Sequence, residues 1–199
     1  MIALVKGISA LFLVAALGCG GGGPNVGATF NGVVRGQPMT PADAVSSPAH
    51  LLFSGVDAQV AAIVLTDVPN VCPKLSANTQ PKSAKALLIA LADFNAFPPS
   101  LTAPAGPGTF TVYDPTSGGI PPAHLAVVSF AADDASCIPT VQPAAGTSGS
   151  VRITSASGGS FTGTYTVGFE TGEQVNGEFH TANCPGLATF LSGTTHPCG

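Results

Sequence analysis

Hydrophobic and polar residues alternate along the C-terminal third of the chain. The apolar positions are odd-numbered: Val151, Ile153, Phe161, Tyr165, Val167, Phe169, Val175 and Phe179. The polar positions between them are even-numbered: Arg152, Thr154, Thr162, Thr164, Thr166, Asn176, Glu178 and His180. Because successive side chains of a strand point to opposite faces, this period predicts strands with one buried and one solvated face. Ser157-Gly158-Gly159 and Thr171-Gly172-Glu173 predict tight turns, so we expect an antiparallel meander of three strands.

Shorter apolar runs predict further strands upstream. They lie at residues 30–34, 51–53, 58–65, 84–91, 109–113 and 125–131. The run at 84–91 is apolar on all sides, and we interpret it as a buried strand because its neighbours are strands and prolines flank it. Residues 37–48 are polar and residues 98–107 are rich in proline, which predicts loops.

One short helix is expected near residues 69–77. Asp67 is a candidate cap, Pro69 falls in the first turn where proline is tolerated, and Pro73 limits the helix to about two turns. With about eight to ten short strands, the pattern predicts an all-β fold, mainly an antiparallel β-sandwich or a small barrel.

Charge is scarce in this chain of 199 residues. Only 8% of the residues are charged, against roughly a quarter in an ordinary globular domain. The chain has ten acidic and six basic residues. Because phosphate backbones are held by clustered Lys and Arg, this composition excludes nucleic acid as an expected partner.

The N-terminal segment has the organisation of an export signal. Lys6 supplies a positive charge, residues 8–17 form a short apolar run, and the small Gly18 stands at a cleavage position. The sequence Ala16-Leu17-Gly18-Cys19 resembles the lipobox of bacterial lipoproteins. That resemblance implies removal of residues 1–18, attachment of diacylglycerol to the Cys19 sulfur, and acylation of the new N-terminus by chains such as palmitate.

The lipobox resemblance also implies a cellular location. Gly20, in place of Asp, is similar to the outer-membrane sorting state of lipoproteins in two-membraned bacteria, so we expect a signal peptide, a membrane anchor and a cell-envelope location. Residues 19–26 carry four consecutive glycines and are expected to form a flexible tether. Residues 27–199 then make one β-rich domain, similar in style to other bacterial envelope lipoproteins, and this analogy transfers no catalytic residue.

Cysteine usage agrees with export. With Cys19 assigned to the lipid, Cys72, Cys137, Cys184 and Cys198 remain. Four cysteines in an oxidising compartment predict two disulfide bonds, with three possible connectivities. We favour Cys72–Cys137 together with Cys184–Cys198, because the second pair would close a short loop and hold the C-terminal tail.

No motif for catalysis or cofactor binding occurs. The glycines around Cys19 formally match G-x-G-x-x-G, but no strand precedes them and the predicted cleavage divides them. The histidines are His50, His124, His180 and His196, and no two lie at a metal-ligand spacing on one element. His180 and Glu178 share a solvated strand face and are the pair of greatest interest. Asp133, Asp134 and Ser136, with Asp114, could hold calcium weakly, but a solvated turn is favoured. We expect neither metal nor cofactor.

These observations favour a non-enzymatic, lipid-anchored binding or structural module, with an envelope protein or surface ligand as partner. One alternative is an envelope hydrolase with a site built from loops, including His180 and Glu178. A second alternative is a carrier of a small ligand. Converging His, Ser and acidic side chains in a pocket would favour the hydrolase, a threonine-rich sheet face would favour binding, and an empty apolar cavity would favour the carrier.

Overall fold

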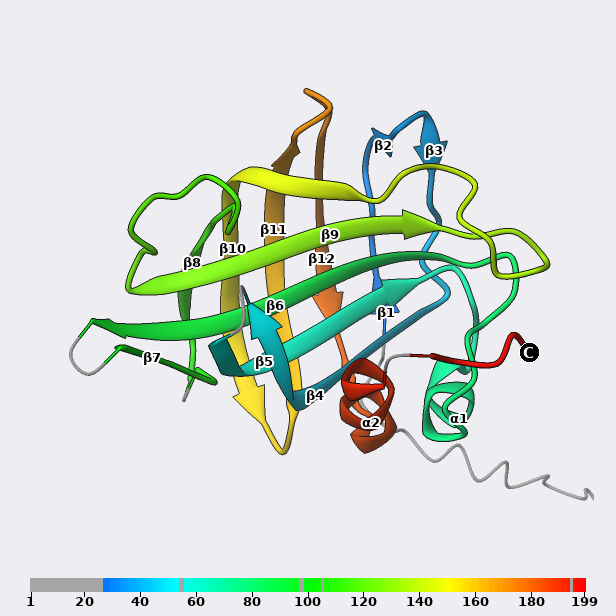
Figure 1. Ribbon diagram of the computed structural model, residues 1–199, viewed down its shortest axis with the longest axis horizontal. Helices are drawn as coiled ribbons and strands as arrows, with labels where there is room; N and C mark the ends of the chain where they lie inside the picture. Colours follow the sequence, from blue (N-terminus) through cyan, green and yellow to red (C-terminus); the bar gives the residue numbers. More distant parts are fainter. Residues whose placement is uncertain (1–26, 54–55, 97–98, 105, 194) are drawn as a thin grey trace, which may run out of the picture.

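The computed structural model describes residues 27–53, 56–96, 99–104, 106–193 and 195–199 (Figure 1). The predicted signal peptide, Cys19 and the tether lie outside these residues. The described strands are β1 (Gly27–Ala28), β2 (Val33–Val34), β3 (Gln37–Pro38), β4 (Asp43–Phe53), β5 (Val56–Thr66), β6 (Lys85–Ala96), β7 (Pro99–Thr102), β8 (Gly108–Val112), β9 (His124–Ala132), β10 (Ala144–Ser157), β11 (Ser160–Phe169), β12 (Gln174–His180) and β13 (Ala182–Asn183). The two described helices are α1 (Val71–Ser76) and α2 (Pro185–Ser192).

The predicted all-β class is confirmed. Eleven strands form one mixed sheet in the order β1-β12-β11-β10-β8-β9-β6-β5-β4-β13, with β7 paired to β6, while β2 and β3 form a separate hairpin. Pairing is antiparallel except between β8 and β9 and between β13 and β4. β1 and β13 end the sheet and are not paired to each other within the described residues, so the arrangement is a sandwich-like fold and not a closed barrel.

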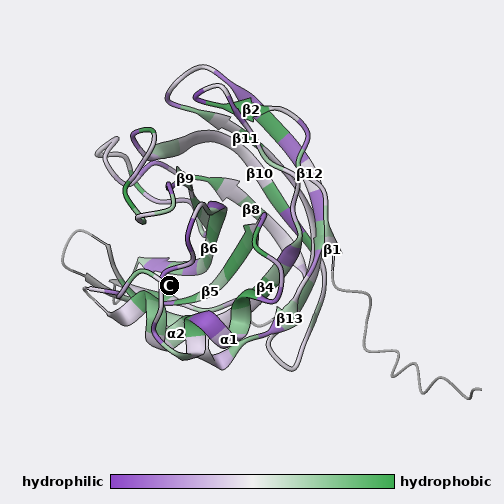
Figure 2. Ribbon diagram, turned by 90° about the vertical axis from the view of Figure 1, so that its right-hand side faces the viewer, coloured by the Kyte–Doolittle hydropathy of each residue, from purple (hydrophilic) through white to green (hydrophobic). Residues whose placement is uncertain are grey.

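The sheet turns back on itself to make two layers. β8, β10, β11 and β12 lie in one layer, and β4, β5, β6 and β9 cross them in the other (Figures 1 and 2). The main hydrophobic core fills the space between the layers. Its fully buried side chains include Ile63, Leu87, Phe110, Phe130, Val151 and Phe179. All eight apolar positions of the meander are buried there, which confirms the predicted period of two.

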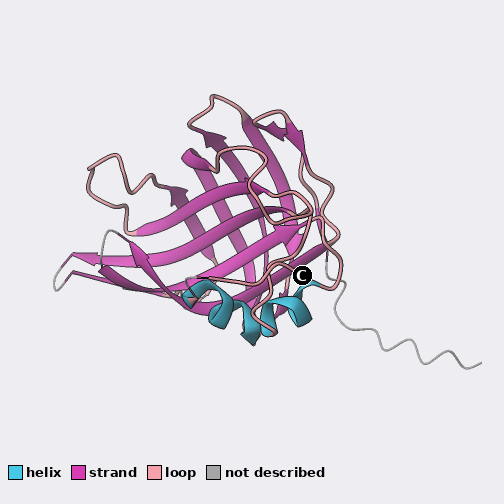
Figure 3. Cartoon of the chain, turned by 45° about the vertical axis from the view of Figure 1, so that its right-hand side comes forward, coloured by secondary structure: helices cyan, strands magenta, loops and turns pink. Residues whose placement is uncertain are grey.

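The two helices cover the outer face of the second layer (Figures 2 and 3). A second apolar cluster lies between them and the sheet, with buried members that include Val60, Ala62, Val71, Leu75 and Leu187. β5 and β6 are thus apolar on both faces, which explains why the run at 84–91 lacks alternation, and the predicted buried strand there is confirmed.

The prediction of a loop at residues 37–48 is wrong. Residues 37–38 form β3, and β4 begins at Asp43. The polar appearance of this segment comes from hydroxyl groups that are buried but satisfied. Ser46 Oγ donates to the carbonyl oxygen of Gly159 at 2.7 Å and also contacts Thr181 Oγ1 at 2.6 Å. A short strand, β7, likewise lies inside the segment 98–107 predicted to be a loop.

The predicted first helix exists but is shorter, and its N-cap position is Asn70 and not Asp67. It spans Val71–Ser76, and the Asp43 carboxylate, not Asp67, accepts the backbone N–H of Val71 at 2.8 Å. Asp67 instead accepts the N–H of Lys85 at 2.7 Å. The second helix, Pro185–Ser192, was not predicted, because its eight residues are rich in small and hydroxyl side chains.

The described residues form two disulfides, as expected, but the favoured pairing is wrong. Cys72 bonds to Cys184, and Cys137 bonds to Cys198. The first bond joins α1 to the start of α2, which lie side by side. The second joins the loop after β9 to the C-terminal tail, which is held along Gln80 by two backbone hydrogen bonds.

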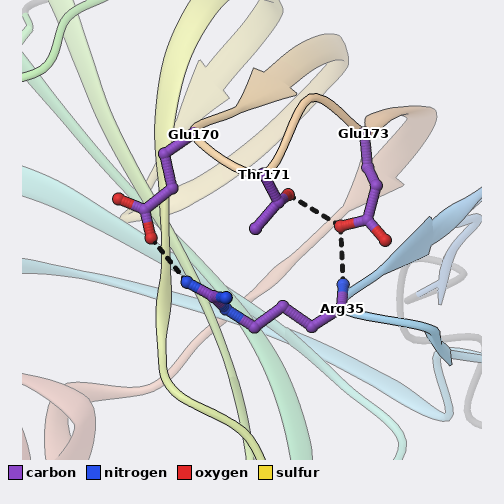
Figure 4. Close-up of polar contacts among 4 residues, drawn as sticks. All are labelled: Arg35, Glu170, Thr171 and Glu173. Carbon is purple, nitrogen blue, oxygen red and sulfur yellow. Dashed lines mark hydrogen bonds and ion pairs between the residues drawn. The ribbon is translucent and has the colours of Figure 1, made fainter.

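A carboxylate fastens the small β2–β3 hairpin to the sandwich (Figure 4). Glu173 accepts the backbone N–H groups of Arg35 at 2.6 Å and Gly36 at 3.2 Å, and Arg35 Nη2 pairs with Glu170 at 2.7 Å. The hydroxyl of Thr171 also donates to Glu173. This hydroxyl is the main reason that the pKa of Glu173 lies below its ordinary value, followed by the N–H of Arg35. The hairpin thereby carries Val34 into the core.

Candidate binding face

The solvated face of the meander carries a regular array of hydroxyl and amide groups. Thr154, Thr164, Thr166, Asn176 and Glu178 are exposed, whereas Thr162 and His180 are half-buried. Exposed threonines at 109 and 111 of β8 continue the array onto a fourth strand. We call this surface the hydroxyl face. The predicted solvated face of the meander is therefore confirmed.

Strand pairing sets these side chains in rows. One row crosses four strands in the order Thr109, Arg152, Thr164 and Glu178. The adjacent row has Thr111, Ser150, Thr166 and Asn176. Neighbouring strands lie about 4.8 Å apart, and alternate residues along a strand lie about 6.8 Å apart. The hydroxyl face is consequently a grid whose spacing is fixed by the backbone.

Two adjoining hollows mark the edge of the hydroxyl face where β1 pairs with β12. The first has a volume of about 500 Å³, and its lining includes Thr162, Thr164, Glu178 and His180. The second, also of about 500 Å³, shares Thr164 and Glu178 with the first and adds Asn176. Because they share these walls, the hollows make one open groove along β11 and β12.

Glu178 and His180 both line this groove. Both are even-numbered positions of the same strand, so the alternation predicted that they share a face. The backbone N–H of Glu178 donates to Thr29 Oγ1 at 3.0 Å, which fixes the strand while the carboxylate stays exposed. His180 Nδ1 lies 2.7 Å from Thr162 Oγ1, and its Nε2 is buried without a hydrogen-bond partner in the described structure. Buried polar atoms are usually paired, so an unpaired nitrogen at this position is unusual.

The Thr162–His180 pair has the separation of a nucleophile and its base, but it lacks a third group. Nucleophilic catalysis also needs a residue that orients the base through its second nitrogen. No described side chain contacts His180 Nε2 through a hydrogen bond. The groove can therefore offer donors and acceptors to a ligand, whereas the hydrolase hypothesis finds no complete set of groups here.

The other histidines lie apart from this groove. His124 Nδ1 pairs with Asp93 at 2.7 Å on β9 and β6, and His196 Nδ1 lies 2.9 Å from Asn78 Oδ1 in the C-terminal tail. His50 is an exposed residue of β4. The structure thus brings no two of the four histidines into one site among the residues it describes.

The acidic residues considered for calcium also lie in separate turns. Asp134 Oδ1 accepts the backbone N–H groups of Ser136 and Ile138, and Asp114 Oδ1 accepts both the N–H and the hydroxyl of Thr116. The Thr116 hydrogen bonds lower the pKa of Asp114. Within the part of the chain that is described, no three His, Cys, Asp or Glu residues are grouped to hold a metal ion.

Sequence reasoning missed the residues that complete the groove from a distant part of the chain. Asn31 donates to the Asn176 side chain, and Thr29 borders both hollows. Tyr165 is a core residue, as predicted. Burial raises its pKa, and its hydroxyl donates to the Thr29 carbonyl oxygen at 2.8 Å. Only the pairing of β1 with β12 reveals this neighbourhood, because these residues are about 140 positions apart.

The chain matches no protein-family model, no curated protein and no solved structure. Neither described helix is long and apolar enough to cross a membrane. Inference of function therefore depends on the chain's own residues and their arrangement.

Proposed function

We propose that the protein is a non-enzymatic binding module of the cell envelope, anchored by lipid on Cys19 to the outer membrane. The observation that carries the binding role is the hydroxyl face, a solvated grid of hydrogen-bonding side chains across four strands with a groove at its edge. The threonine side chains that line the groove supply hydrogen-bond donors and acceptors to a ligand.

The chemistry of the hydroxyl face favours a neutral, polyhydroxylated ligand. Arg152 and Glu178 stand on either side of Thr164 in one row, so their charges balance. Hydroxyl and amide groups both donate and accept hydrogen bonds, which suits the hydroxyl groups of a sugar chain. A polyanion would instead need clustered arginine or lysine. We therefore propose an envelope glycan as the partner.

The lipid anchor would hold the groove near the membrane. Gly27, the first described residue, lines the first hollow. Only the seven residues 20–26 separate Cys19 from Gly27 in the sequence. The groove would then meet glycans that lie within a few nanometres of the bilayer surface.

Co-sedimentation with isolated glycan tests this function. We would compare peptidoglycan sacculi with the purified polysaccharide of the outer leaflet, using the mature chain with Cys19→Ser to keep it soluble. Thr164→Val and Thr166→Val remove hydroxyl groups with little change of shape, and Glu178→Gln removes the charge. The triple variant should bind at least tenfold more weakly. Thr102→Val, on β7 and outside the face, is the matched control and should bind normally.

The result also identifies the glycan. Binding to only one of the two materials assigns the partner to the wall or to the outer leaflet. Failure of the wild-type chain to bind either material, or equal binding by the triple variant, would overturn the proposed role of the hydroxyl face.

A further inference from the structure

A separate apolar cavity lies on the other side of the molecule, between the helices and the outer face of β5, β6 and β9. Its volume is about 300 Å³. Aliphatic and aromatic side chains make most of its wall: Val64, Leu75, Leu88, Leu187, Phe190 and Leu191. This size is at the lower end of the range of small-molecule sites, which are typically lined by apolar groups with a few polar ones.

Small residues on the sheet create the space. Ala86 of β6 and Ala131 of β9 are direct partners in the sheet register, and both line the cavity. Larger side chains at these two positions would fill it. The apolar wall opposite them comes from α1 and α2.

The two helices that cover the cavity are fixed relative to each other. The Cys72–Cys184 bond joins them, with Cα atoms 5.7 Å apart. They also touch at Gly186, where an added Cβ would clash with Ser76, so they already approach as closely as a glycine permits. They therefore cover the cavity as one unit, and side chains of both helices line it.

Polar groups gather at one end of the cavity, where the C-terminal tail crosses. Gln80 Nε2 donates to Asp133 Oδ2 at 2.9 Å, and the ring of His196 stacks on Phe190 with centroids 3.8 Å apart. The Cys137–Cys198 bond fixes this tail. The cavity therefore has a mainly apolar body, to which Thr66 and Ser129 add hydroxyl groups, and a polar end at Gln80, Asp133 and His196.

The arrangement favours holding a ligand over hydrolysing one. Ser129, Asp133 and His196 all line the cavity. However, His196 Nδ1 lies 2.9 Å from Asn78 Oδ1, and the Asp133 carboxylate accepts a hydrogen bond from Gln80. No hydrogen bond joins Ser129 to His196 among the described residues, so the nucleophile–base contact of a hydrolase is missing.

We propose that this cavity binds a small, uncharged, mainly aliphatic molecule that bears a hydroxyl group at one end. The apolar walls would take the aliphatic part. The Asp133 carboxylate accepts hydrogen bonds and repels anions, so it selects a hydroxyl group over a carboxylate of the same chain length.

Displacement of an uncharged fluorescent probe tests the proposal. The mature chain with Cys19→Ser, which carries no acyl chain of its own, is titrated with N-phenyl-1-naphthylamine and then with decan-1-ol or decanoate. We expect decan-1-ol to displace the probe at a concentration at least tenfold lower than decanoate. Asp133→Asn should reduce that preference at least threefold, because it removes the charge and keeps an acceptor for Gln80.

A filling variant locates the site. Ala131→Leu should reduce probe affinity at least tenfold, whereas Val127→Ile, on the same face of β9 but outside the lining, should leave it unchanged. Ala86→Leu serves if the first variant does not fold. Absence of probe binding in the wild-type chain, equal binding by the filling variant, or a preference for decanoate would each overturn the proposal. Variants of the hydroxyl face should not affect this assay.

Discussion

Replacement of both Cys72 and Cys184 by alanine should destabilise the protein strongly. The bond links residues 112 positions apart. In the chain-entropy model, a loop of that length stabilises the folded state by about 4.8 kcal/mol. The second bond crosses this loop, because Cys137 lies inside it and Cys198 lies outside. The bond that remains already restricts the unfolded chain. We therefore expect the free energy of unfolding to fall by about 3–4 kcal/mol.

Urea unfolding of the oxidised wild type and of the double variant measures this loss. At this chain length, the change corresponds to a Tm lower by about 10 °C. Replacement of Cys137 and Cys198, which are 61 positions apart, is the comparison and should cost somewhat less, since its loop is shorter. A loss below about 1 kcal/mol for the first variant would refute the reasoning, as would disulfide mapping of the wild type that recovers Cys72–Cys137.

Two further changes test single contacts. Because the pKa of Glu173 is lowered in the folded state, its contribution to stability is present above the unfolded value of 4.5 and is lost as the pH falls through the folded value. Glu173→Gln should therefore flatten the decline of Tm below pH 5, and an unchanged decline would contradict this. Thr181→Val should cost about 1–3 kcal/mol, since the backbone N–H of Phe161 and the hydroxyl of Ser46 lose a buried partner. Thr181→Ser keeps the hydroxyl and should lower the free energy of unfolding by less, as measured by urea unfolding. Equal losses of stability in the two variants would argue against the hydrogen bonds.

Local pattern predicted much of the fold. The period of two located the meander, and the apolar runs located β5, β6, β8 and β9, because burial of one or both faces leaves a direct mark on sequence. The run at 51–53 located only the end of β4. Its first part was predicted as a loop, since the buried hydroxyl of Ser46 resembles a loop residue until its distant partner Thr181 is known. A hydrogen bond between residues 135 positions apart leaves no local signal.

The candidate site was predicted only in part. Parity placed Glu178 and His180 on one solvated face, and the structure places both in the groove. Thr29 and the cavity of the outer face depend on strand order and helix packing, which a short pattern does not encode. The disulfide pairing failed for the same reason, because it follows from the contact of α1 with α2 and not from the spacing of cysteines.

The most direct test of the central claim is metabolic labelling with radioactive palmitate in a two-membraned bacterial host that expresses the protein, followed by partition between membrane and soluble fractions. We predict that the wild-type chain incorporates label and stays with the membrane until detergent is added, whereas Cys19→Ser is unlabelled and soluble. An unlabelled wild-type chain, or a Cys19→Ser chain that still requires detergent for release, would contradict the lipid anchor.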